Sequence, residues 1–310
     1  MPSAAYLHLA IVYVVWGTVY PVIRVALIDA NAPTPMQLQT GRLLLSAAVL
    51  ATPLVLRARF IVKDRRALAL CLVSGFLFWV TGNGFATLSL RQLPAGFVTM
   101  VAAGIPLWTA VFQSLVDRQG ISRMQVASLV FGFIGIAVVF FPALSSVGQA
   151  DLYKPFELTV AFLAPVTWAL GSMLQRPLQK TMAPEVAASV QMAAGGVCCL
   201  VLASVEGAPL PDRFSQAEII AFLYLVLFVG ALCFSSYIKV TRLFPPHIGA
   251  SFAYVNPVVS LLLAWLFLGE QIALTSLLGM ATVIASVVVL LWHAHRSAYR
   301  AATPGMLRDR

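Results

Sequence analysis

Charged side chains are scarce in this chain of 310 residues. Asp, Glu, Lys and Arg together make up 10% of the sequence, whereas 60% of the residues are hydrophobic and the mean hydropathy is +0.91. A water-soluble chain of this length would have too few charges to cover its surface. The composition therefore excludes a soluble globular fold and predicts a protein embedded in a lipid bilayer.

Cysteine is also rare, and the motifs of metal and nucleotide sites are missing. The four cysteines lie inside apolar runs and lack the paired spacing of metal ligands: Cys71, Cys198, Cys199 and Cys233. We expect them to act as small hydrophobic residues. The sequence contains neither an H-E-x-x-H motif nor a P-loop. We therefore expect no metal and no cofactor, and the missing P-loop argues against an ATP-driven pump on this chain.

The 11 acidic residues avoid the centres of the apolar runs. Those nearest to a run stand at its ends, namely Glu157, Glu185, Glu218 and Glu270. A proton-coupled carrier usually has an ionisable group within its pathway. The sequence therefore shows no acidic residue placed to couple transport to protons. His8, near one end of the first run, is more typical of packing or of the membrane interface than of a proton relay.

Ten apolar runs of about 20 residues are present, each long enough to cross a bilayer core of about 30 Å. They predict an all-α integral membrane protein with ten transmembrane helices over residues 6–27, 36–56, 67–90, 95–116, 124–141, 156–178, 185–205, 218–239, 249–268 and 272–292.

The basic residues predict the orientation. If both termini are cytoplasmic, the cytoplasmic segments hold 15 of the 20 Lys and Arg residues and the outer segments hold three. This asymmetry follows the positive-inside rule. It predicts a multi-pass protein of the cell (inner) membrane, and it explains the net charge of +9 without a nucleic-acid partner. The last two basic residues, Arg24 and Arg42, lie within the first two runs.

The chain repeats itself after about 151 residues. At that offset Pro257 aligns with Pro106, Gly279 with Ser128, and Ser286 with Gly135. Each copy holds five spans, an odd number, so the second copy enters the membrane in the opposite orientation. The sequence therefore predicts two inverted five-helix repeats, residues 1–148 and 149–310, with the second ending in a short basic cytoplasmic tail. Secondary transporters often use this plan, with the substrate site near mid-membrane between the halves.

A family resemblance rests on residues spread over nearly the whole chain. They are Trp16-Gly17-Thr18 with Pro21 and Arg24, then Arg42, Pro106, Gly249-Ala250-Ser251, Asn256-Pro257 and Leu268-Gly269-Glu270. In order and spacing they resemble the paired EamA domains of the drug/metabolite transporter superfamily. The first copy departs from that pattern at Gln119, where the family commonly has Glu. The resemblance implies a carrier that exports or takes up amino acids, metabolites or toxic organic compounds.

Tryptophans mark the predicted substrate cavity. In the first span Tyr13, Trp16, Tyr20 and Arg24 are spaced to share one helical face, which should look inward because an Arg facing lipid is costly. Tyr20 could equally belong to the aromatic belt at the outer interface. Trp16 and Trp168 are 152 positions apart and hence nearly equivalent across the repeat. A cavity walled by tryptophan suits aromatic or amphipathic solutes.

The predicted binding set includes polar residues on neighbouring spans. Arg42 could hold a substrate carboxylate, or it could satisfy a helix end, reach the interface or pair with Asp29. Trp79 and Asn83 share a face of the third span with Phe76. The complete set is Tyr13, Trp16, Tyr20, Arg24, Arg42, Trp79, Asn83, Trp108, Trp168, Ser172 and Asn256.

Prolines and small residues predict mechanical features. Pro21, Pro106, Pro165 and Pro257 interrupt spans and could act as hinges or as static kinks. Small residues form stripes in the fifth and tenth spans, which predict packing faces within one chain or a homodimer.

The leading prediction is a secondary transporter, an exporter of small organic solutes such as amino acids or aromatic metabolites. Its partners would be the small-molecule substrate and the lipid bilayer. An intramembrane enzyme is disfavoured because no paired acids or histidine-rich metal site lies within the spans. A channel, a scaffold, or an uptake carrier for a vitamin, a drug or a metal-binding metabolite stay open as alternatives.

Overall fold

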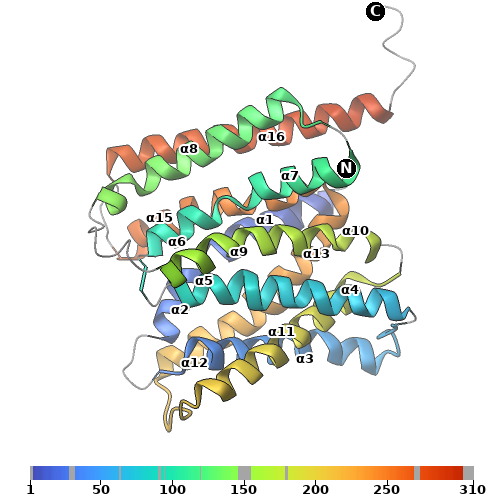
Figure 1. The fold of residues 1–310 in the computed structure, drawn as a ribbon, viewed down its shortest axis with the longest axis vertical. Helices are drawn as coiled ribbons and strands as arrows, with labels where there is room; N and C mark the ends of the chain where they lie inside the picture. Colours follow the sequence, from blue (N-terminus) through green and yellow to red (C-terminus); the bar gives the residue numbers. More distant parts are fainter. Residues whose placement is uncertain are drawn as a thin grey trace, which may run out of the picture.

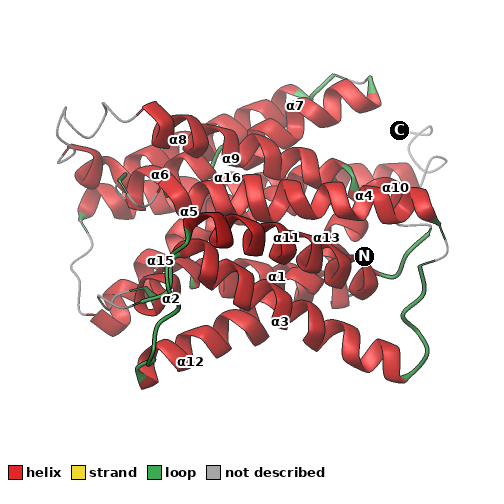
Figure 2. Cartoon of the chain, turned by 60° about the horizontal axis from the view of Figure 1, so that its bottom comes forward, coloured by secondary structure: helices red, strands yellow, loops and turns green. Residues whose placement is uncertain are grey.

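The computed structural model describes residues 3–27, 32–62, 64–89, 92–93, 95–118, 120–145, 155–178, 181–268 and 273–302. Every regular element in these ranges is a helix (Figures 1 and 2). Eight helical segments of this part are long and apolar enough to cross a membrane, and Ala4–Gly17 and Arg123–Val139 are shorter apolar helices. The all-α membrane fold is confirmed, and the ten predicted spans are consistent with these segments.

The first repeat comprises five helical segments. In chain order they are α1 (Ser3–Gly17) with α2 (Val19–Ala26); α3 (Pro35–Leu56); α4 (Arg65–Gly75) with η1 (Phe76–Gly84) and α5 (Phe85–Ser89); α6 (Ala95–Ala102) with α7 (Ile105–Asp117); and α8 (Arg123–Ser145).

The second repeat follows the same plan. Its segments are α9 (Pro155–Met173) with α10 (Gln175–Leu178); α11 (Pro184–Glu206); α12 (Gln216–Tyr224) with η3 (Leu225–Phe234) and α13 (Ser235–Leu243); α14 (Pro246–Ala250) with α15 (Phe252–Leu268); and α16 (Leu274–Ala302). The predicted boundary at residues 148 and 149 lies outside the described residues.

Local sequence signals set several helix ends. The side chain of Thr34 accepts a bond from the Gln37 backbone at 3.2 Å, and the Gln37 side chain accepts one from the Thr34 backbone at 2.9 Å. Ser215 and Glu218 form the same capping box at the start of α12. The C-terminal end of α11 is capped by Gly207, whose φ of 64° suits glycine. These caps satisfy backbone groups that a helix cannot pair internally.

Both repeats carry a π-helical segment in their third span. The segments η1 and η3 begin at Phe76 and Leu225, 149 positions apart, so they are nearly equivalent across the repeat. A π-helix is rare and is frequently found at functional sites, because its extra residue per turn moves side chains off the regular helical face. The repeat detected in the sequence is thus matched by a repeated irregularity in the backbone.

The four prolines predicted as hinges differ in their surroundings. Pro21 and Pro106 lie in the first turn of α2 and α7, just after breaks in their spans, where a helix needs no backbone donor. Pro165 and Pro257 lie inside the continuous helices α9 and α15. The break nearest Pro257 is at Ser251. Although Pro106 and Pro257 are equivalent in sequence, their spans therefore break at different distances from the proline.

The helices lie roughly side by side across the view of Figure 1, with α8 and α16 along one edge and α3, α11 and α12 along the opposite edge. The helices α1, α9, α13 and α15 lie between these edges. Small residues let α8 and α16 approach closely: a Cβ added to Gly135 would lie 3.0 Å from the backbone nitrogen of Val283. These small residues pack within the chain, and a homodimer through the two helices stays a prediction.

We expect Gly279→Ala to destabilise this helix pair. An added Cβ would lie 2.6 Å from the backbone nitrogen of Val139 and 2.7 Å from the carbonyl oxygen of Gly135, so the two backbones must separate. Overpacking of this kind costs about 1–3 kcal/mol. Thermal unfolding in detergent should show a lower midpoint for this variant. Gly120→Ala is the matched control, because nothing lies within 4 Å of its added Cβ; equal midpoints for both variants would contradict the prediction.

Candidate functional site

A pocket lies between the two repeats. Its empty space, including the open mouth, is about 730 Å³. The first repeat contributes residues of its first four spans to the wall, and the second repeat contributes residues of α9, η3 and α15. Six of the predicted binding residues line this pocket, namely Trp16, Arg42, Trp79, Asn83, Trp168 and Asn256, together with the prolines Pro165 and Pro257.

The aromatic part of the pocket is built around the two tryptophans that the repeat relates. Trp16 and Trp168 meet edge to face, with ring centroids 5.5 Å apart and planes at 81°. The ring centroids of Phe252 and Trp16 are 4.6 Å apart, and those of Trp79 and Trp168 are 5.9 Å apart. Both pairs also meet edge to face. Such a cluster presents large, rigid apolar surfaces to a ligand.

The polar part of the pocket is centred on Arg42, whose side chain is only 2% exposed. Its Nε donates to Gln39 Oε1 and its Nη2 donates to Asn83 Oδ1, both at 2.5 Å. Gln39 Nε2 donates to the same Asn83 oxygen at 2.5 Å, and the guanidinium carbon lies 5.6 Å from the ring centre of Trp79. Two neutral amides and one aromatic face are therefore among the contacts that fix the direction of the guanidinium.

Asn256 supplies a second polar group in the wall. Its Oδ1 is buried and accepts no hydrogen bond. A buried polar atom without a partner costs free energy, which a ligand can recover by pairing with it. The pocket thus combines aromatic surfaces, one cation and one available amide. Among the described residues that line it, none is Asp, Glu or His.

The pocket lies nearer the end of the molecule opposite the two termini. Asn83 and Ala86 line it close to the end of α5 at Ser89, and Thr99 lines it close to the start of α6. In Figure 1, α5 and α6 lie toward the left, whereas the start of α1 and the end of α16 lie toward the right. The pocket therefore lies toward one end of the helical bundle. The opposite end, where α1 begins and α16 ends, is called the terminus side.

A layer of hydrogen-bonded side chains closes the terminus side of the pocket. Tyr237, fully buried on α13, accepts from Trp168 Nε1 at 3.2 Å and shares a hydrogen bond of 2.6 Å with Ser172. Tyr13 bonds Ser251 at 2.6 Å, which joins α1 to the turn between α14 and α15. Tyr13 and Ser172, predicted as binding residues, lie in this closing layer and do not line the pocket.

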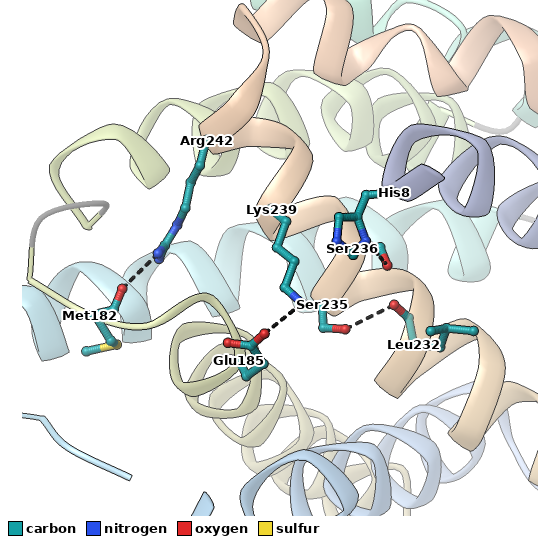
Figure 3. A network of polar contacts seen from close by, with 8 residues as sticks. All are labelled: His8, Met182, Glu185, Leu232, Ser235, Ser236, Lys239 and Arg242. Atoms are coloured by element: carbon teal, nitrogen blue, oxygen red, sulfur yellow. Dashed lines mark hydrogen bonds and ion pairs between the residues drawn. The ribbon is translucent and has the colours of Figure 1, made fainter. Parts of the chain in front are cut away.

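A further polar network lies beyond that layer, and Figure 3 shows it. Lys239 on α13 forms an ion pair of 2.7 Å with Glu185 on α11, and His8 on α1 bonds Ser236 at 3.1 Å. Arg242 donates to the carbonyl oxygen of Met182 at 2.8 Å. These contacts tie α13 to α1 and to the start of α11 on the terminus side.

The other predicted residues lie elsewhere. Trp108 is 41% exposed, stacks on Phe112 and does not line the pocket. Pro106 is buried and Pro21 exposed, and neither lines the pocket. The side chains of Tyr20 and Arg24 lie outside the described residues.

Four residues of the site and of the layers beside it were not predicted. Gln39 stands three positions before Arg42, a spacing at which helical side chains can bond, and this was the available signal. Tyr237 and Ser236 are polar residues at the end of a largely apolar span. Phe252 directly follows the Gly249-Ala250-Ser251 segment but had no signal of its own.

A helical bundle within the membrane, with a pocket walled by two repeats, defines a multi-pass membrane transporter. The chain belongs to the EamA-like transporter family, which matches residues 3–141 and 155–292. The matches account for both repeats, and they point to a transporter rather than an enzyme.

Two relatives cover most of the chain. An "Uncharacterized inner membrane transporter YedA" of Escherichia coli (strain K12) is 27% identical over 279 residues, which are 90% of this chain and 87% of the relative. A "Probable amino-acid metabolite efflux pump" of Salmonella typhimurium is 25% identical over 291 residues, 90% of this chain and 92% of the relative. A solved structure titled "Crystal structure of protein" has a TM-score of 0.78 at 18% identity, covers 96% of this chain and 99% of its own, and shows the shared fold.

Proposed function

We propose that this transporter exports small organic solutes bearing a carboxylate and an apolar or aromatic body, such as amino acids and aromatic metabolites. The observation that carries the proposal is the pocket between the repeats, whose wall holds three tryptophans and a guanidinium fixed by Gln39 and Asn83. A planar guanidinium can bind a carboxylate through two parallel hydrogen bonds. The tryptophans would cover the body of the solute, and Asn256 would pair with a second polar group. The name of the Salmonella relative agrees with this class of substrate.

The substrate class also follows from what the wall lacks. A cationic solute would meet Arg42 without an acidic side chain among the described residues that line the pocket. Like charges in a desolvated site repel strongly, so the pocket disfavours cations and favours anions and zwitterions.

The proposed mechanism is alternating access. With both termini in the cytoplasm, as the basic residues predict, the pocket side faces outward and the closed side faces the cytoplasm. Export would require the Tyr13–Ser251 and Tyr237–Ser172 contacts to separate so that solute enters from the cytoplasm. The breaks at Thr18 and Ser251 and the four prolines are the proposed points of bending.

We expect transport to proceed without stoichiometric proton coupling. Arg42 stays protonated at physiological pH, and none of the described lining residues is Asp, Glu or His. The carrier would then move solute down the solute's own gradient, as suits the release of an accumulated metabolite.

Purified protein in vesicles tests both parts of this proposal. A thermal-shift screen of metabolites should first identify carboxylate-bearing ligands, because a ligand that binds only the folded state raises its stability. A ligand found in this way should show saturable counterflow, and an imposed pH gradient without a solute gradient should produce no accumulation. Absence of counterflow for every ligand would contradict a carrier. Uphill accumulation abolished by a protonophore would contradict the uncoupled mechanism, and Glu270 and His8 would then be the first positions to replace.

A further inference from the structure

A second hollow lies on the outside of the molecule, apart from the substrate pocket. It is a groove between α3, α4 and α11 with an empty space of about 1160 Å³. Most of its lining is apolar, including Ala48 and Ala51 of α3, Leu72 of α4, and Ala194 and Val197 of α11. Leu72 and Val197 are half exposed, so the groove opens toward the surroundings of the helices.

Along α3 the groove extends over about two thirds of the depth of one bilayer leaflet. Its lining on α3 runs from Leu44 to Ala51, about 10 Å along a helix axis, and it continues to Phe60 in the connection to α4. One leaflet of the hydrocarbon core is about 15 Å deep. An extended acyl chain therefore fits along the groove, with its head group near Phe60.

Four arginines lie close in sequence to Phe60, the lining residue at that end of the groove. Arg57, Arg59, Arg65 and Arg66 lie in or beside the connection that contains Phe60, and all four are exposed. None of their side chains forms an ion pair or a hydrogen bond in the described structure.

The geometry of the connection keeps these charges near the groove. Arg57 is six positions beyond Ala51, about 9 Å along the helix axis, and Arg59 is the neighbour of Phe60. The acid in this connection, Asp64, is occupied as the cap of α4, where it accepts from the Arg66 backbone at 2.8 Å. The cationic side chains are thus available to an anion at the membrane surface.

We infer that this groove and its arginines bind an anionic phospholipid, with one acyl chain in the groove and the phosphate on the arginines. Basic side chains at a membrane surface attract anionic lipids, and basic pockets between spans hold their head groups. The same lipid explains both the apolar groove and the unpaired charges beside it. A second copy of the chain is a poorer occupant, because a two-fold contact would bring the same arginines against each other.

The test measures thermal unfolding of the full chain in a neutral detergent while dioleoylphosphatidylglycerol or dioleoylphosphatidylcholine is added. We expect phosphatidylglycerol to raise the unfolding midpoint at concentrations at least fivefold below those needed for phosphatidylcholine. Arg57→Gln with Arg59→Gln should abolish this difference. Arg118→Gln with Arg123→Gln, which removes two exposed charges from the α7–α8 connection, none of whose described residues lines this groove, should preserve it.

A second pair of variants tests the groove itself. Ala48→Leu should fill the groove and raise the phosphatidylglycerol concentration required at least threefold, whereas Ala285→Leu, on an exposed face of α16, should not. The inference would be overturned if both arginine double variants lost the preference for phosphatidylglycerol equally. Equal stabilisation of the parent chain by the two lipids would overturn it too. The same stabilisation by inorganic phosphate would overturn the lipid as ligand. A change in oligomeric mass caused by Ala48→Leu would instead identify a second copy as the occupant and overturn it too.

Discussion

Replacing Arg42 with Gln is expected to lower the affinity for a carboxylate-bearing solute by at least tenfold. A hydrogen bond to a charged group contributes about 1.5–3 kcal/mol, and each 1.4 kcal/mol corresponds to a factor of ten. The guanidinium is buried in the pocket wall and held by Gln39 and Asn83, so its direction does not have to be fixed when the solute binds. Arg42→Lys should recover only part of the affinity, because an ammonium lacks the planar fork that matches a carboxylate.

The control for Arg42 is a change in the ligand. L-phenylalanine and L-phenylalaninamide differ at the carboxyl group, and both should be measured by thermal shift with the parent chain and with Arg42→Gln. The substitution should weaken binding of the acid, while the amide, a cation that Arg42 repels, should bind the variant at least as tightly as the parent chain. An equal loss for both ligands would show that Arg42 acts on the fold of the pocket, through its bonds between α3 and η1, and would contradict a carboxylate contact.

Much of the fold follows from hydrophobic run length alone. The predicted span over residues 95–116 compares with α6 and α7, which end at Asp117, and the span over residues 185–205 compares with α11, which ends at Glu206. Run length works here because every backbone group inside the bilayer must be paired within the helix. The prolines predicted interruptions near two of the breaks, at Pro21 and Pro106, but the positions of the breaks were not predicted, because they depend on tertiary contacts. Ser251 is an example, since its hydroxyl bonds both Tyr13 and the carbonyl oxygen of Ile248.

The sequence predicted several residues of the pocket wall, but it did not separate them from residues that lie one turn away. The offset of 152 positions placed Trp16 and Trp168 in equivalent parts of the two repeats, and in the structure their rings meet. Helical periodicity tells which face a residue occupies but not its neighbours or its depth in the bundle. Tyr13 and Ser172 share faces with the two tryptophans, yet each lies about one turn away and bonds within the closing layer. The π-helical segments add a further shift that a regular period of 3.6 residues does not contain.

Replacing Trp16 or Trp168 with Ala is expected to weaken solute binding by roughly 30-fold, since truncation of a buried aromatic anchor at a binding site costs about 2 kcal/mol or more. Each ring lines the pocket and touches the other, so either truncation removes contact area and loosens the remaining tryptophan. Phe replacements should retain more binding than Ala replacements, because an aromatic surface stays in place. Binding is measured by quenching or by thermal shift, and transport by saturable uptake into vesicles.

Two sets of control variants separate a binding role from general destabilisation. Trp265→Ala and Trp292→Ala remove tryptophans that are 53% and 52% exposed, and they should leave affinity nearly unchanged. Phe78→Ala is the stricter control, because Phe78 is fully buried and packs 4.9 Å from Trp168 but does not line the pocket. It should lower the unfolding midpoint, since removing a buried aromatic costs about 3–5 kcal/mol, while changing affinity far less than Trp168→Ala does. If Phe78→Ala weakened binding as much as the tryptophan variants, the aromatic cluster would act as core and the pocket would not be the substrate site.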